Sequence, residues 1–145
     1  MRVVIQRVTQ ASVSVKNQVV GKINKGFLVF IGIQKGDTWE QASYLANKVS
    51  HLRIFEDTQG KMNLALADVG GEILAISQFT LAGDTSRGNR PGFETAARPE
   101  EAEPLYEYFV ECLRQAGHHV ETGIFQTDMK VSLINDGPST FILER

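Results

Sequence analysis

A continuous apolar run, Phe27–Ile33, constrains the fold of this chain more than any other feature of its sequence. The run follows Gly26 and has the length of one strand. It lacks the alternation of apolar and polar residues that is expected of a strand with one solvent-exposed face. It therefore predicts a strand that is covered on both faces, at the centre of a sheet. With 145 residues, 42% of them hydrophobic, the chain can supply the apolar layers within a single domain, residues 1–145, without disulfides or metals.

Further strands are expected on either side of this run. Met1–Val8 is rich in β-branched residues and Ala11–Val15 alternates apolar with polar residues, which predicts an opening pair of strands. Glu72–Leu81 is apolar in its first half and becomes polar in its second half. Near the end of the sequence, Met129–Leu143 predicts two strands separated by the turn-forming residues 135–138.

Two amphipathic helices are also predicted. The first begins near Asp37 and Thr38, each of which can form a capping box with the residue three positions further on. A short strand, Leu52–Phe55, is expected to follow it. The second helix starts at Pro99 and ends at Gly117. Their apolar stripes, at helical spacing, are Ala42, Leu45, Ala46 and Val49 in the first and Ala102, Leu105, Tyr106, Phe109, Val110 and Leu113 in the second.

The order of these elements is strands, helix, strands, helix, strands, without a regular βαβ alternation. Each helix has one apolar stripe, so each should pack that stripe against a sheet and leave its opposite face to solvent. The expected fold is a single mixed α/β (α+β) domain, in which β-sheets form a barrel-like core with two main helices packed on it.

Charge and composition exclude several classes of protein. A net charge of −2 argues against a protein that coats a long stretch of nucleic-acid backbone, so any contact with a nucleic acid should be local, at an end. The sequence has neither the apolar core of a signal peptide nor an 18-residue apolar run, which predicts a soluble, cytoplasmic protein. Cys112 is the only cysteine, which excludes an intrachain disulfide.

Signatures of cofactor and metal chemistry are missing. The sequence contains no Walker loop, no zinc-protease motif and no dinucleotide fingerprint, so neither a cofactor nor a metal is expected. His118 and His119 are adjacent, and neighbours in an extended segment point to opposite faces, so they cannot easily bind one metal together. His51 is interpreted as packing at the end of its helix, and Cys112 as a small buried side chain.

Two segments could carry chemistry. Ser77–Leu81 places hydroxyls, an amide and free backbone N–H groups at the end of an apolar strand, as an oxyanion hole requires. Composition alone favours the alternative, a strand with a polar solvent face. The Gly137–Pro138 bond is expected to be trans by base rate alone. Between these segments, residues 82–97 are typical of a long loop, and long loops are often functional.

The same two segments carry a resemblance to a known family. Ser77–Leu81 (Ser-Gln-Phe-Thr-Leu) and Asn135–Thr140 (Asn-Asp-Gly-Pro-Ser-Thr) are similar, in order and position, to the two signature motifs of the D-aminoacyl-tRNA deacylases. The resemblance extends to Ile5–Val8, Gly60–Leu64 and Asp128–Leu133, and covers nearly the whole chain. The sequence is therefore identified as a member of this family.

The resemblance implies a hydrolase that cleaves the ester of D-aminoacyl-tRNA, or of glycyl-tRNA mischarged on tRNA(Ala), into free amino acid and tRNA. It implies a homodimer in which a cis Gly137–Pro138 motif of each subunit enters the other's site and rejects L-aminoacyl-tRNA by shape. The partner is the acceptor end of an aminoacyl-tRNA, with neither DNA nor a membrane as a partner. Candidate phosphate contacts are Arg87, Arg90, Arg98 and Lys130.

The resemblance also assigns the site residues. The predicted catalytic residues are Ser77, Gln78, Phe79 and Thr80. Backbone amides near Phe79 and Thr80 would stabilise the oxyanion, while Ser77 and Gln78 position the substrate. Thr80 can be interpreted as a nucleophile, but no base is identifiable near it, so we favour water activated by the tRNA's own 2′-hydroxyl.

Three further residues complete the predicted site. Arg7 would brace the Gly137–Pro138 loop, and Phe125 and Met129 would line the adenine pocket. The chain departs from the family where it reads Phe125–Asp128 before Met129, because small residues are frequent there. Two alternatives stay open: an esterase of broader substrate range, and a non-catalytic dimeric module that binds RNA ends or DNA.

Overall fold

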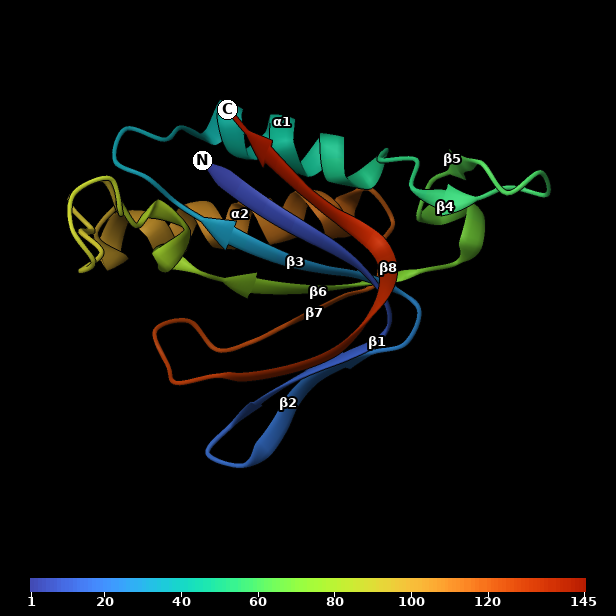
Figure 1. Ribbon diagram of the computed structural model, residues 1–145, viewed down its shortest axis with the longest axis horizontal. Coiled ribbons are helices and arrows are strands. Elements are labelled where there is room, and N and C mark those ends of the chain that lie inside the picture. Colours follow the sequence, from blue (N-terminus) through green and yellow to red (C-terminus); the bar gives the residue numbers. More distant parts are fainter.

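The apolar run forms β3 (Gly26–Gly32), inside a six-stranded sheet, in a computed structural model that describes residues 1–145. The other strands of this sheet are β1 (Arg2–Val15), β2 (Gln18–Ile23), β6 (Glu72–Ser77), β7 (Val120–Thr122) and β8 (Lys130–Glu144). Their order is β2-β1-β3-β6-β7, with β8 paired to β1. β3 is antiparallel to β1 and parallel to β6. The helices α1 (Trp39–Ser50) and α2 (Pro99–Gln115) lie together over one face (Figure 1).

Alternate residues of β3 enter two different apolar cores. Phe27, Val29 and Ile31 belong to the larger core, which the sheet shares with the stripes of α1 and α2. Leu28 points the other way, into a smaller core with residues of β1, β2 and β6. Both faces of the strand are therefore covered, as predicted, and this is why its sequence does not alternate.

The sheet curls until its two sides approach each other. The first half of β1 pairs with β3 and its second half with β2, while β8 pairs along both halves. On β2, a Cβ added to Gly21 would lie 2.7 Å from the carbonyl oxygen of Thr122 in β7, so β2 and β7 come close where the curl nearly closes. The predicted mixed α/β fold with a barrel-like core and two helices is confirmed.

The two helices also follow the prediction. Thr38 is the N-cap of α1 and forms the capping box with Gln41, so the second of the two possible registers is the one adopted. Pro99 is the first residue of α2, and Gly117, at φ +92°, follows its end. All ten apolar residues of the two stripes are buried. Neither helix is long and apolar enough to cross a membrane.

Several strand predictions need correction. The expected pair Met1–Val8 and Ala11–Val15 is one continuous strand, β1, because β8 pairs across the residues between them. Met129–Leu143 is likewise one strand, β8, with an irregularity where a turn was predicted. Strand β2 was not predicted.

Two predicted strands are shorter than expected. Only Phe55 of Leu52–Phe55 lies in a strand, β4 (Phe55–Glu56), which pairs with β5 (Met62–Leu64). The segment Glu72–Leu81 leaves the sheet after Ser77 and forms a short 3-10 helix, η2 (Phe79–Ala82). Gly32 permits this fold-back, since a Cβ there would lie 2.7 Å from the Cβ of Leu81.

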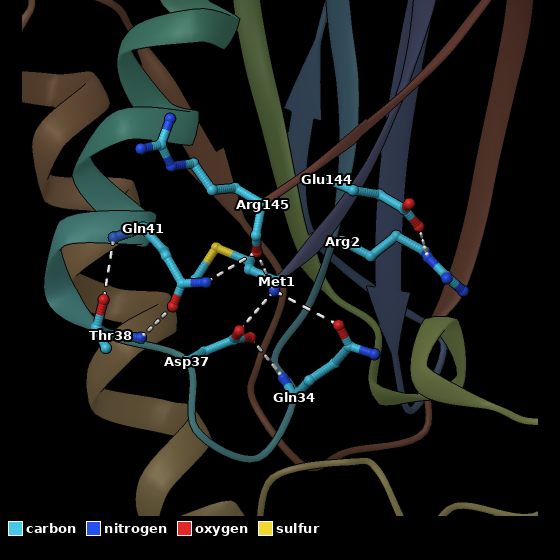
Figure 2. Close-up of polar contacts among 8 residues, drawn as sticks. All are labelled: Met1, Arg2, Gln34, Asp37, Thr38, Gln41, Glu144 and Arg145. Carbon is cyan, nitrogen blue, oxygen red and sulfur yellow. Dashed lines mark hydrogen bonds and ion pairs between the residues drawn. The ribbon is translucent and has the colours of Figure 1, made fainter.

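The two chain termini meet beside α1 (Figure 2). The α-ammonium group of Met1 donates to Asp37 Oδ1 at 2.5 Å and to the carbonyl oxygen of Arg145 at 2.9 Å. Gln41 of α1 donates its side-chain amide to the same Arg145 oxygen at 3.0 Å. Asp37, which could have capped α1, instead pairs with the ammonium group and accepts from the Gln34 N–H at 2.7 Å. These contacts tie the N-terminus before β1 and the C-terminus after β8 to the start of α1.

Candidate functional site

A cavity of about 580 Å³ lies at the C-terminal end of β6, where Glu72–Leu81 turns polar. Ser77, Gln78 and Phe79 line it from the strand end, and Phe125 and Met129 line it from the segment between β7 and β8. Five of the nine predicted site residues therefore surround one space of the size that holds a small ligand. The remaining lining residues are Ile33, Ile76, Ala97, Pro99, Ala102, Gln126, Thr127, Asp128 and Val131.

The strand end places backbone donors beside this cavity. The N–H of Gln78 donates to the Ile31 carbonyl at 2.8 Å, which continues the backbone pairing with β3 one residue past β6. Phe79 and Thr80 follow in the first turn of η2. The first N–H groups of a helix have no acceptor within it, so these two can serve a ligand. Ser77 and Gln78 are half-buried against the cavity, which disfavours the alternative of a strand with a polar solvent face.

Thr80 is exposed and does not line the cavity. Its hydroxyl accepts a hydrogen bond from the side-chain amide of Gln78. An amide group cannot remove a proton at neutral pH, and no histidine or carboxylate contacts this hydroxyl. The geometry therefore offers Thr80 no base that would make it a nucleophile.

The opposite wall is held by α2 and by a glycine. The ring of Phe125 lies 6.0 Å from that of Tyr106, measured between centroids. The buried Tyr106 donates its hydroxyl to the carbonyl oxygen of Ala75 in β6 at 2.9 Å, and burial raises the pKa of this phenol. A Cβ added to Gly123 would lie 2.4 Å from Met129 Sδ, so the thioether packs directly on the glycine.

Several residues of the site were missed by sequence reasoning. Tyr106 was assigned only to an apolar stripe, although a buried tyrosine usually signals a hydroxyl with a specific partner. Gln126, at φ +60°, and Thr127, whose hydroxyl donates to the Ile124 carbonyl at 2.8 Å, shape the loop before Met129. Asp128 places one carboxylate in the cavity lining. No local pattern in the sequence pointed to these loop residues.

Gly137 and Pro138 lie elsewhere, in a bulge of β8 formed by residues 136–139. Gln6 pairs with Thr140 and Val8 with Asn135, so four residues of β8 stand opposite the single residue Arg7. The Gly137–Pro138 bond is cis, which overturns the base-rate expectation of a trans bond. Both residues are exposed, and neither lines the cavity.

Arg7 contacts this bulge through its guanidinium group. Its Nε donates to the carbonyl oxygen of Asp136 at 3.0 Å and lies 3.3 Å from the carboxylate of the same residue. Its Nη1 donates to the carbonyl oxygen of Ile54. Arg7 is only 5% exposed, so the cation is buried under the bulge that it supports. Arg7 therefore contacts Asp136, the residue before Gly137, and its role in bracing the Gly137–Pro138 loop stays a prediction.

The bulge and the cavity are far apart within one chain. Ser77 pairs with Ile31 and Ile31 with Val3, while Arg7 lies four residues further along β1. At about 3.3 Å per residue and about 4.8 Å per strand, roughly 16 Å of sheet separates Arg7 from Ser77, and the bulge on β8 lies one strand further, roughly 20 Å from Ser77. Pro138 of a chain therefore does not reach the cavity of that chain.

The strand that carries the bulge exposes apolar side chains. β8 pairs only with β1, and Ile134 and Ile142 on it are 52% and 64% exposed. The hydroxyl of Ser139, within the bulge, is buried without a hydrogen-bond partner. An edge strand with exposed isoleucines is the kind of surface that a second chain covers.

The other candidates from the sequence take separate positions. His118 lies 2.6 Å from the Ser50 hydroxyl and His119 pairs with Glu121 at 3.0 Å, so the two imidazoles diverge as predicted. His51 contacts the Asn47 carbonyl at 2.9 Å at the end of α1, and Cys112 is half-buried against the larger core. Arg87, Arg90, Arg98 and Lys130 are all exposed, as phosphate contacts would need to be.

Known sequences resemble this chain over its whole length. The sequence model of the family described as D-Tyr-tRNA(Tyr) deacylase matches residues 4–144. The D-aminoacyl-tRNA deacylase of Geotalea uraniireducens is 60% identical over 144 residues, which are 99% of this chain and 93% of that protein. The D-aminoacyl-tRNA deacylase of Pelobacter propionicus is 58% identical over 145 residues, the full length of both.

Solved structures share the fold. A protein described as c-Myc DNA Unwinding Element Binding Protein superposes with a TM-score of 0.94 at 39% identity, over 100% of this chain and 99% of that one. A probable eukaryotic D-amino acid tRNA deacylase superposes with a TM-score of 0.84 at 20% identity, over 98% and 97% of the chains, and supports the fold alone. Together with the sequence matches, these likenesses confirm the predicted resemblance, the fold class and an enzyme of the hydrolase type. The chain belongs to the D-Tyr-tRNA(Tyr) deacylase family.

Proposed function

We propose that this chain hydrolyses the ester between a D-amino acid and the 3′ end of a tRNA, and that it also removes glycine mischarged on tRNA(Ala) while it rejects L-aminoacyl-tRNA. The observation that carries the proposal is the cavity at the end of β6, where the N–H groups of Phe79 and Thr80 stand beside Ser77 and Gln78. Such donors stabilise the oxyanion that forms when an ester is attacked.

The reaction needs little from the side chains in this arrangement. Water adds to the ester carbonyl, the carbonyl oxygen becomes an oxyanion held by the two backbone N–H groups, and the bond to the 3′-oxygen of the tRNA then breaks. The neighbouring 2′-hydroxyl of the substrate assists in activating the water, and the departing 3′-oxygen takes up a proton. Thr80, which has no base beside it, holds Gln78 rather than attacking.

The adenosine end of the substrate would lie between the strand end and the opposite wall. Phe125 offers an aromatic ring for the adenine, and Met129 offers a polarisable thioether next to it. The amino acid would then point along the strand end, towards the mouth of the cavity. No cofactor takes part in the proposed reaction.

Selection against L-amino acids would come from a second subunit. In the proposed homodimer the exposed edge of β8 is covered, and Gly137–Pro138 of each subunit enters the other's cavity. Main-chain carbonyl oxygens of this bulge accept hydrogen bonds from the substrate ammonium group, and an L side chain would collide with the same backbone. Glycine has no side chain and is not excluded.

The proposed partner is the acceptor end of tRNA in the cytoplasm. Arg98 and Lys130 are exposed and adjoin residues that line the cavity, and Arg87 and Arg90 are exposed on the loop after η2, so these cations are proposed to contact phosphates. A net charge of −2 agrees with binding that is confined to the end of the nucleic acid.

The test compares hydrolysis of D-tyrosyl-tRNA with hydrolysis of L-tyrosyl-tRNA and glycyl-tRNA(Ala), without added metal or cofactor, by release of the amino acid. Turnover of the D and glycyl esters alone is expected. Hydrolysis of the L ester at a similar rate would indicate a broad esterase. Substrates that end in 2′-deoxyadenosine should be hydrolysed far more slowly, and equal rates would remove the 2′-hydroxyl from the mechanism.

A second candidate is a nucleic-acid-binding module without catalysis. The solved structure at 39% identity is described as a protein that binds a DNA unwinding element, and this observation favours the candidate. The absence of a basic face on a chain of charge −2 counts against binding to a DNA duplex. Binding of aminoacyl-tRNA or duplex DNA without hydrolysis of any ester would establish this second function.

A further inference from the structure

An exposed aromatic pair stands at the rim of the cavity. Phe79 and Phe93 have ring centroids 5.1 Å apart at an interplanar angle of 58°. Phe79 is 56% exposed and Phe93 is 39% exposed, although both are large apolar side chains. Phe79 also lines the cavity, whereas Phe93 does not, so the pair extends from the cavity wall to the surface outside it.

The protein holds Phe93 in this position. A Cβ added to Gly83 would lie 3.2 Å from a ring carbon of Phe93, so the ring lies against the bare Cα of this glycine. The Thr95 hydroxyl donates to the Ala82 carbonyl at 2.7 Å and fastens the chain on either side of the ring. These contacts therefore fix the ring in its exposed position.

Positive charge lies directly beyond the pair. Asp84 and Gly92 exchange backbone hydrogen bonds of 2.8 Å in both directions and close a hairpin at the rim. Arg87 and Arg90 lie in this hairpin, and both are exposed. The hairpin is the loop seen in yellow beyond the end of β6 in Figure 1. Exposed aromatic rings next to exposed arginines form the usual binding surface for single-stranded nucleic acid.

The size of the cavity leaves a role for this surface. A cavity of about 580 Å³ can hold one aminoacylated nucleoside, within the range of about 300–1,000 Å³ for small-ligand sites. The nucleotide that precedes the terminal adenosine must then lie outside. Its base would then lie at the rim, where Phe79 and Phe93 are exposed.

We propose that Phe79 and Phe93 form a stacking platform for the base of the penultimate nucleotide of the tRNA 3′ end, with Arg87 and Arg90 contacting the phosphates on its 5′ side. This inference rests on the proposed function, because it assumes that the aminoacylated end occupies the cavity. The platform makes the enzyme prefer a polynucleotide over an isolated aminoacyl-nucleoside, and it needs no base-specific hydrogen bond.

The test measures kcat/KM of the wild type and of Phe93→Ala on D-tyrosyl-tRNA and on 3′-O-(D-tyrosyl)adenosine, a substrate without the penultimate nucleotide. Phe93→Ala removes one stacking face. It is expected to lower about tenfold the ratio of kcat/KM on the tRNA to kcat/KM on the adenosine ester. Phe93→Trp should keep the ratio near its original value, because it retains an aromatic face. Phe93→Leu keeps apolar bulk against Gly83 but should lower the ratio.

The matched control is Tyr44→Ala, which removes an exposed aromatic ring of α1 that lies beside Arg145 and does not line the cavity at the end of β6. The ratio should not change in this variant. An equal loss on both substrates in Phe93→Ala, or a ratio in Phe93→Leu like that of the wild type, overturns the platform while the proposed function stands. Failure of the wild type to hydrolyse either substrate overturns the proposed function and the platform with it.

Discussion

The end of β6 and the bulge of β8 contain the two most distinctive segments of the sequence, and they differ in almost every physical respect. The strand end lines a cavity with Ser77, Gln78 and Phe79, and a helical turn with free N–H groups begins beside it. The bulge stands exposed on an edge strand, rests on a buried arginine, and borders no cavity of its own chain. The strand end is suited to stabilising a transition state, whereas the bulge is suited to inserting into another molecule.

This difference shows that the cavity and the bulge do not meet within one chain. Roughly 20 Å of sheet separates them, so a joint role requires two copies. The hydroxyl of Ser139 has no hydrogen-bond partner, and Ile134 and Ile142 of β8 are exposed. In the proposed homodimer, the strand end supplies catalysis and the bulge supplies selection, and this division of labour can be tested region by region.

The largest effect is expected at the strand end from Phe79→Pro, which removes one backbone N–H. Pro is tolerated at the first position of a helix, so the fold should persist. Loss of one oxyanion donor should lower kcat about 10²- to 10³-fold. The matched variant Phe79→Ala keeps the N–H and removes the same ring. Similar kcat values in the two variants would show that this N–H does not stabilise the oxyanion.

A smaller effect, on stability, is expected at the bulge from Arg7→Met. The change leaves the carbonyl oxygens of Asp136 and Ile54 without their donor, which should cost about 2–3 kcal/mol in the free energy of unfolding, measured by urea denaturation. Arg53→Met is the control, because Arg53 also donates to a main-chain carbonyl, that of Asn63, but from an exposed position. A cost near zero for both would mean that Arg7 does not support the bulge.

Selection by the bulge can be tested with Pro138→Ala. Pro138 is exposed, so folding should change little, whereas the D-over-L preference in kcat/KM should fall about tenfold through loss of shape. The experiment measures both esters in parallel, together with the midpoint of thermal unfolding. An unchanged preference would remove the bulge from chiral selection and leave the strand end as the whole site.

The smallest effect concerns His118, which belongs to neither region. Burial, and then the nearby His51, lower the pKa of His118 below its ordinary value of 6.5. The unfolded chain therefore takes up this proton first, so the contribution to stability is complete above about pH 6.5 and is lost as pH falls towards the folded-state pKa. His118→Gln should flatten the decline of the melting temperature below pH 6.5 without changing D-over-L preference. A parallel decline in both proteins would contradict this.

Prediction from sequence succeeded where a local pattern reflects local physics. The run Phe27–Ile33 predicted a strand buried on two faces. Successive side chains of a strand point to opposite faces, so a run without alternation indicates that both faces are covered. Thr38 and Pro99 predicted helix starts that the structure confirms, since capping involves residues within one turn. The polar end of Glu72–Leu81 located the cavity, although its helical turn was not foreseen.

Prediction failed where the cause lies in a distant segment. Nothing near Val8 shows that β1 continues, because β8 pairs across that point. Nothing near Tyr106 shows that its hydroxyl meets Ala75, and nothing near Met129 shows that Gly123 makes room for it. These contacts join residues that only the curled sheet and the packed helix bring together.

The sequence by itself therefore determined the two helices, the central strand, the faces that they bury and the two segments that mark the family. Periodicity, capping and turn chemistry act over a few residues, and each leaves its trace in the order of amino acids. Only the tertiary structure decided that Ser77 and Phe125 share a cavity while Pro138 stays about 20 Å away from it. Such distances depend on strand order and register, which arise when remote segments pair and not from any local stretch of the chain.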